Sequence, residues 1–399
     1  MDAPPMEHAL RDRVTEILDR CTSCGACAEV CSGSGHCIPA CQHGVNPRLM
    51  LALARVADVG RGDSGGRRKV GFTRFGAMTT GVRVLSRLQM PPDLLARFRP
   101  ESDLVNDASA EPPEVVFYTG CNVMKTPHIA LLCLDIMDAL GVRYRVMGGP
   151  SACCGVLQFG AGDLATSGRI AYRTIDRLAA AAPRALSWCP TCQVQLGEIA
   201  APTKPDTRLD MRPFVLFLAE RLDTLRPLLR HPVRKRVGLH EHPGTAGVPE
   251  AAQAILRCIP ELDLVDLEQP RVGYMCNKLS PLPAFKQDVH RQQLQAAADA
   301  GVTTLAGIYH ACHRELCSHE RDWPFEVVNF LELVGESMGL QRPDLFKRLK
   351  IMQDIDAILQ DAAPMLTANG LDLEEARDVI LRDMLGEQPL ALAGSALTI

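Results

Sequence analysis

The residues best suited to chemistry in this 399-residue chain are its sixteen cysteines. Most lie in tight clusters or at matching positions of an internal repeat. A disulfide framework is disfavoured, because the chain is not small and its polar N-terminus lacks the apolar segment of an export signal. Clustered thiolates are metal ligands, so we expect these cysteines to bind metal.

The first constellation is the run CTSCGACAEVC, which contains Cys21, Cys24, Cys27 and Cys31. Gaps of two residues let three thiolates on a tight loop face one iron–sulfur cubane, with a fourth ligand arriving from elsewhere. Zinc sites use paired CxxC motifs, and a triple CxxCxxC run suits them poorly. The run therefore predicts a [4Fe-4S] cluster of the ferredoxin type.

The fourth ligand of this cluster has two candidates. In bacterial ferredoxins the fourth cysteine of the run ligates the other cluster and is followed by proline, whereas Ser32 follows Cys31 here. The later pair Cys37 and Cys41, followed by GVNPR, resembles the end of a second ferredoxin motif without its first half. By that resemblance Cys41 completes the cluster, while Cys31 and Cys37 are spare or share a second one. We favour a single cubane.

The second constellation is spread over 72 residues of the chain. Each of its three groups follows a predicted strand, and such loops converge at the carboxyl edge of a parallel sheet. Five thiolates distant in sequence are therefore expected to meet. They are Cys121, Cys153, Cys154, Cys189 and Cys192.

The elements that position these cysteines follow an alternating pattern of short strands and helices from Glu114 onward, which predicts parallel α/β sheets. The pattern recurs: 122 residues separate Cys154 from Cys276, and 120 separate Cys192 from Cys312. We interpret residues 114–340 as two similar α/β units in tandem.

The order Cys, Cys-Cys-Gly, Cys-x2-Cys resembles the cysteine-rich CCG domain of heterodisulfide reductases and of the iron–sulfur subunits of glycolate oxidase and anaerobic glycerol-3-phosphate dehydrogenase. A helical ferredoxin module followed by two CCG units is the arrangement of the heterodisulfide reductase D subunit. The resemblance implies a noncubane or second [4Fe-4S] cluster held by the five cysteines of the second constellation. It also implies three regions: a helical ferredoxin-like domain (1–100), a complete CCG domain (114–230) and a degenerate one (231–340). The residue pattern of 341–399 adds a helical C-terminal tail.

The second unit departs from this family pattern, since Tyr309 stands where the first cysteine of CxxC is expected. Its candidate metal ligands are His242, Cys276 and Cys312, which suit zinc or iron. The same predicted loops also contain His240, Glu241, His310 and His313. The alternative interpretation, which the sequence alone favours, is a decayed cluster site that binds no metal and tolerates Cys276→Ala at little cost.

Composition narrows the function further. A formal net charge of −4 argues against a nucleic-acid partner. No apolar run is long enough to span a membrane. We therefore expect a cytoplasmic protein that contacts membranes only through a partner protein. The segment RGDSGGRRK (61–69) reads as a linker, and Cys317 with His319 reads as a surface loop.

The sequence thus predicts an iron–sulfur electron-transfer subunit of a multi-subunit oxidoreductase. No nucleotide or flavin fingerprint is visible in the sequence. A partner protein, such as a flavin-dependent dehydrogenase, must therefore carry out the chemistry on the substrate. The alternative is a heterodisulfide reductase-like catalytic subunit that reduces a disulfide at the CCG cluster. No residue can be assigned a catalytic role from the sequence.

Overall fold

The computed structural model describes residues 64–98, 112–204, 206, 208–242, 244–280 and 283–393. The expected ferredoxin-type ligands Cys21, Cys24, Cys27, Cys31 and Cys41 lie outside these residues. The account below therefore concerns the two α/β units and the helices around them.

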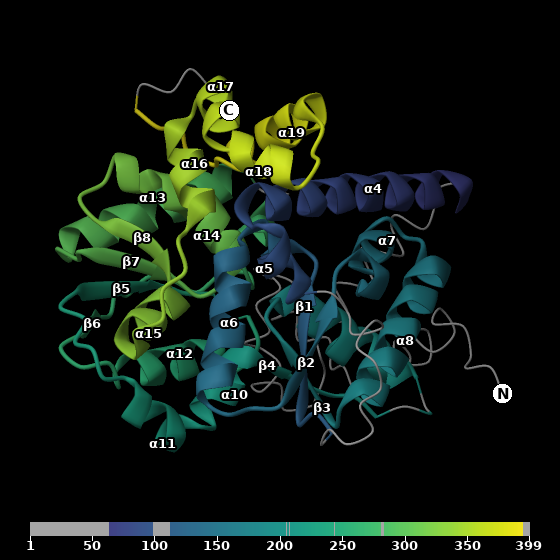
Figure 1. Cartoon of the computed structure of the whole chain (residues 1–399), viewed down its shortest axis with the longest axis horizontal. Helices are drawn as coiled ribbons and strands as arrows, with labels where there is room; N and C mark the ends of the chain where they lie inside the picture. Colours follow the sequence, from purple (N-terminus) through teal and green to yellow (C-terminus); the bar gives the residue numbers. More distant parts are fainter. Residues whose placement is uncertain are drawn as a thin grey trace, which may run out of the picture.

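Two four-stranded parallel sheets form the framework of the described chain (Figure 1). The first has the order β2-β1-β3-β4, and the second repeats it as β6-β5-β7-β8. The expected pair of tandem α/β units with parallel sheets is therefore confirmed. The strands are β1 (Val115–Gly120), β2 (Tyr144–Gly148), β3 (Arg184–Ser187), β4 (Asp210–Pro213), β5 (Arg236–His240), β6 (Asp263–Val265), β7 (Thr304–Gly307) and β8 (Glu326–Asn329).

The central strands are buried along almost their whole length, because helices cover both faces of each sheet. All six residues of β1, VVFYTG, are buried, as expected for a parallel strand enclosed on both sides. The covering helices of the first unit are α6 (Pro127–Ala139), α7 (Val156–Gly160), α8 (Leu164–Ala181), α9 (Pro190–Cys192), α10 (Phe214–Ala219) and α11 (Leu222–Leu225). Those of the second are α12 (Val248–Leu256), α13 (Pro283–Asp299), α14 (His310–Leu316) and α15 (Phe330–Met338).

The two units pack side by side, with α6 and α10 of the first against α15 and α12 of the second. Figure 1 shows α6 running between the two sheets. Trp188, in the loop after β3, stacks on Phe330 of α15 with ring planes 7° apart and centroids 6.2 Å apart. One hydrophobic core accordingly extends through both units.

A long helix, α4 (Ser64–Gln89), runs horizontally at the upper right of Figure 1, below α18 and α19, and is followed by α5 (Pro92–Ala96). The expected linker at 61–69 is wrong for residues 64–69, which form the first turns of α4. The helix passes close to α7, where a Cβ on Gly71 would lie 3.4 Å from Gln158. Once this packed part is helical, each added residue gains a hydrogen bond, and this gain outweighs the low helix propensity of Gly65 and Gly66.

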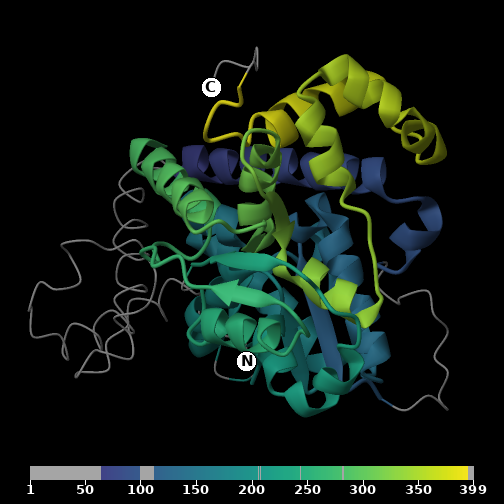
Figure 2. The same cartoon turned by 90° about the vertical axis from the view of Figure 1, so that its left-hand side faces the viewer.

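The C-terminal helices pack against α4 and the second unit, as the turned view in Figure 2 also shows. They are α16 (Leu345–Met352), α17 (Ile355–Asp361), α18 (Ala363–Ala368) and α19 (Leu373–Val379). The expected surface loop at Cys317 and His319 is wrong, since both are buried. Gln388, which follows these helices, hydrogen-bonds the ring of His319 at 3.2 Å.

No helix among the described residues is long and apolar enough to cross a membrane.

Candidate metal centres at the carboxyl edges of the two sheets

The five cysteines of the second constellation meet beyond the carboxyl ends of β1, β2 and β3. Their thiols make a continuous series of contacts, from Cys121 to Cys153, Cys154, Cys192 and Cys189. All five side chains are buried, with at most 7% of their surface exposed. The structure thus brings together the whole set that the sequence assigned to one site.

Two glycines make this convergence possible. Gly120 ends β1 with φ +63°, and a Cβ there would lie 2.9 Å from the sulfur of Cys192. Gly155 has φ +81°, and a Cβ there would lie 2.7 Å from the carbonyl oxygen of Ser167. Both positions combine a left-handed backbone with a close approach that only glycine tolerates. The glycine of Cys-Cys-Gly is therefore needed for the turn that presents the two sulfurs.

Backbone N–H groups surround the sulfurs. The amide of Gly155 donates to Cys153 Sγ at 3.4 Å, and the amide of Cys192 donates to Cys189. Hydrogen bonds from the Cys121 and Cys154 thiols, opposed by burial, lower the pKa of Cys153 to about 3. A hydrogen bond from Cys192, opposed by burial and assisted by His310, lowers the pKa of Cys189 well below its usual range. Hydrogen bonds to the neighbouring sulfurs, together with burial, raise the pKa of Cys121, Cys154 and Cys192 well above the usual range, so the site favours two thiolates among its five sulfurs.

Helix α8 holds the Cys-Cys-Gly turn from beneath, and sequence reasoning missed this role. The Thr174 hydroxyl donates to the carbonyl of Cys153 at 2.7 Å, and the Ser167 hydroxyl donates to the carbonyl of Gly155 at 2.9 Å. Both hydroxyls are buried on an otherwise apolar helix face. The sequence did contain a signal for this role, namely two polar residues seven positions apart on that helix face.

These residues fit an iron–sulfur cluster. The donor set is entirely thiol sulfur, which is the ligand type of iron–sulfur clusters, and two of its members favour the thiolate form. Amides directed at the sulfurs are the groups that tune such clusters. When bound there, a cluster would supply one-electron redox chemistry.

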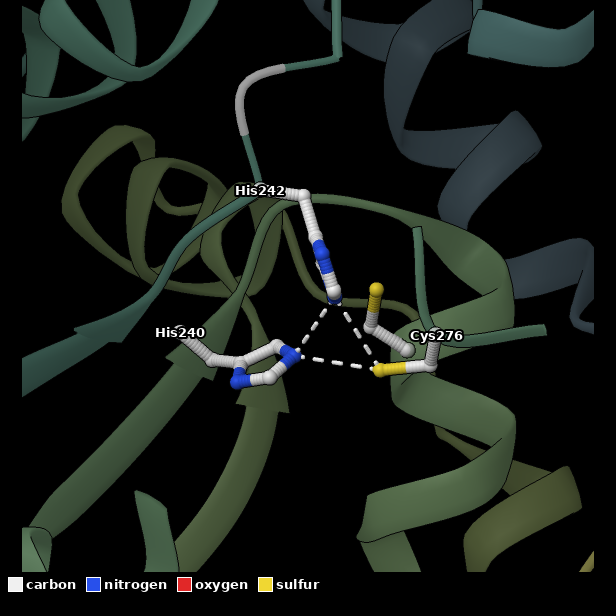
Figure 3. A group of neighbouring side chains, drawn as sticks. His240, His242 and Cys276 are labelled. Carbon is white, nitrogen blue, oxygen red and sulfur yellow. Dashed lines mark hydrogen bonds between the residues drawn. The ribbon is translucent and has the colours of Figure 1, made fainter. Parts of the chain in front are cut away.

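The corresponding edge of the second sheet holds a different group. Ligand atoms of His240, His242, Cys276 and Cys312 all lie within 4.8 Å of one another, and all four side chains are buried. The Nε2 atoms of the two histidines are 3.1 Å apart, and they lie 3.1 and 3.2 Å from Cys276 Sγ (Figure 3). The three expected ligands of this unit therefore come together, joined by His240.

The other candidate residues of these loops point elsewhere. Glu241 lies between the two histidines just after β5, and its side chain pairs with Arg271 at 2.6 Å. His310 lies against Cys189 of the first unit. His313 hydrogen-bonds Asp344 at 2.6 Å.

Two further groups of buried polar side chains adjoin the second site. One joins Cys276 to His290 and to Glu315, whose pKa burial raises to about 7 although Lys286 opposes the rise. The other bridges the two units. It consists of His128 on α6, His313, Glu332 and Asp344. Because its imidazoles and carboxylates come from both units, this second group belongs to the contact between the units.

Comparison with known proteins identifies the first unit. No curated protein matches the chain. Residues 115–197, which include all five clustered cysteines, match the family model of the CCG cysteine-rich domain. The first α/β unit therefore contains, at residues 115–197, a segment that matches the CCG cysteine-rich domain, which is called the CCG domain below.

Proposed function

We propose that this chain is an iron–sulfur electron-transfer subunit of a multi-subunit oxidoreductase. Electrons pass between a partner dehydrogenase and an acceptor through a ferredoxin-type cluster in the predicted N-terminal domain (1–100) and a cluster in the CCG domain. The observation that carries the proposal is the single buried contact series formed by five thiols from three separate loops.

Burial of the five sulfurs supports electron transfer over substrate chemistry. An electron tunnels through packed protein, whereas a disulfide substrate must touch the reacting sulfur. The exposed fractions of 3 to 7% leave little surface for such contact. The heterodisulfide reductase-like alternative also relies, by family resemblance, on clusters in both units. The second unit instead presents two imidazoles and two thiols.

The test is to count and assign clusters in the full chain purified without oxygen. Iron and sulfide analysis with EPR is expected to give about eight irons for two four-iron clusters. Cys154→Ser is expected to remove one EPR signal and Cys24→Ser the other, because Cys154 belongs to the CCG domain and Cys24 to a separate segment.

The matched control is Cys133→Ala. Cys133 is buried on α6, outside the five-sulfur site, and its substitution should leave both signals intact. If Cys24→Ser and Cys154→Ser each abolished both signals in folded protein, two independent clusters would be excluded. If the purified protein bound no iron under these conditions, the proposed function would be wrong.

A further inference from the structure

We propose that the second α/β unit binds one zinc ion through His240 Nε2, His242 Nε2, Cys276 Sγ and Cys312 Sγ. The group has two nitrogen and two sulfur donors, all buried and all within 4.8 Å of one another. Tetrahedral sites with this donor set are typical of zinc. The structure therefore favours the metal-binding alternative that the sequence alone placed second.

The ligand atoms are slightly closer together than in a tetrahedral zinc site. With zinc–nitrogen bonds of about 2.0 Å and zinc–sulfur bonds of about 2.3 Å, ligand atoms lie about 3.3 to 3.8 Å apart. The separations among His240, His242 and Cys276 are 3.1, 3.1 and 3.2 Å, so small outward shifts of these side chains would accommodate the ion. Cys312 completes the set through contacts with the other three. Figure 3 shows the two imidazoles and the Cys276 sulfur directed at one another.

One imidazole is already oriented as a ligand. His242 Nδ1 lies 2.5 Å from the carbonyl oxygen of Val272. A carbonyl only accepts, so Nδ1 carries the proton and Nε2 presents its lone pair to the centre of the group. Metal-binding histidines are characteristically held in this way by a hydrogen bond on the other ring nitrogen.

Comparison of the two units explains how the donor set changed. Tyr118 pairs with Ser187 in the first sheet as His240 pairs with Gly307 in the second. By this register His242 occupies the position of Gly120, the glycine whose absent Cβ leaves room for Cys192. An imidazole there reaches toward Cys312, the counterpart of Cys192.

The site is closed, which indicates a structural role. Four protein ligands fill a tetrahedral zinc ion and leave no position for substrate. A bound zinc ion would position helix α14, because Cys312 lies in the first turn of that helix. His310, the first residue of α14, lies against Cys189 of the CCG domain. Zinc would thus fix the helix that presents His310 to the neighbouring five-sulfur site.

The test is zinc analysis of the full chain by mass spectrometry after purification without added metal. We expect one zinc per chain in the unsubstituted protein, and less than a tenth of that in Cys312→Ala. Cys317→Ala, which removes a buried thiol five residues away on the adjoining helical turn, should keep the full amount. Loss of zinc from Cys317→Ala as well would contradict the assignment.

A conservative variant covers the case in which Cys312→Ala fails to fold. His242→Cys keeps four ligands, so it should retain one zinc per chain, and cobalt bound in its place should absorb more strongly in the thiolate charge-transfer region. The proposal fails if the unsubstituted protein carries no stoichiometric zinc. It also fails if iron fills the site instead, or if His242→Cys leaves the cobalt spectrum unchanged.

Discussion

The two sheets share one strand order yet present opposite chemistry at the same edge. In the first unit, Gly120 and Gly155 have no Cβ atom and so leave room for the five sulfurs to meet. In the second, a histidine fills the place of the first glycine, and only two cysteines remain. A sulfur-only group suits an iron–sulfur cluster, whereas two imidazoles with two thiols suit a single zinc ion. The parallel-sheet edge therefore determines where candidate ligands gather, and a few side chains determine which metal the group would suit.

In our proposals, the difference also separates a site that carries electrons from a site that only stabilises the fold. Zinc has no redox chemistry, so in our proposals electron transfer is confined to the CCG domain and the N-terminal segment. The second unit then acts on electron transfer only through contacts such as that between His310 and Cys189.

The largest expected effect that sharpens this comparison is on folding stability. Cys276→Ala should lower the free energy of unfolding by roughly several kcal/mol, because metal binding is coupled to folding. Cys317→Ala, an equally buried thiol outside the site, should cost about 1 kcal/mol. Urea unfolding followed by circular dichroism measures both. Equal small losses would return the second unit to the decayed-site interpretation.

An intermediate effect is expected on the reduction potential of the CCG domain. His310→Ala removes an imidazole from beside Cys189, and loss of a donor near a cluster sulfur disfavours the reduced state. Neither ring nitrogen of His310 makes a hydrogen bond among the described residues, so the expected shift is smaller than the roughly 60 mV for one electron, or about 1.5 kcal/mol, of a hydrogen bond to a charged group. We expect an EPR-monitored redox titration to show a downward shift below that value. His310→Gln, which keeps a hydrogen-bond donor, should shift the midpoint potential less. An unchanged midpoint potential in His310→Ala would show that the second unit does not influence the cluster of the CCG domain.

The smallest effect concerns the contact between the units. Burial lowers the pKa of His128, and the charge of Lys347 lowers it further. The carboxylates of Asp344 and Glu332 raise this pKa by more, so its net shift is upward. His313 shares the Asp344 carboxylate. A raised pKa stabilises the fold fully below the unfolded value of about 6.5, and this contribution is lost as pH rises through the folded value.

We therefore expect His128→Asn to cost more stability near pH 6 than near pH 9, with a difference of about 1 kcal/mol. Unfolding curves at the two pH values measure it, with the exposed His231→Asn as the control. A cost that grew with pH would show that His128 is neutral in the folded protein.

Sequence reasoning predicted the parts of the site that depend on topology. Loops after parallel strands converge, so the five cysteines and the trio of His242, Cys276 and Cys312 could be grouped from strand positions alone. It failed where distant segments pack. Cys317 was expected at the surface, yet helices that lie later in the chain bury it. Residues 64–69 were expected to be a linker, yet packing on α7 extends a helix through two glycines.

By itself, then, the sequence determined the alternation of strands and helices, the repeat, and which thiols share an edge, because these follow from local periodicity and spacing. Only the tertiary structure decided that His240 joins the second site and that Glu241 does not. It also decided that His310, a residue of the second unit, lies against Cys189 of the first unit. The physical reason is that side-chain direction at a strand end depends on register and on the partner packed opposite, and neither is encoded locally.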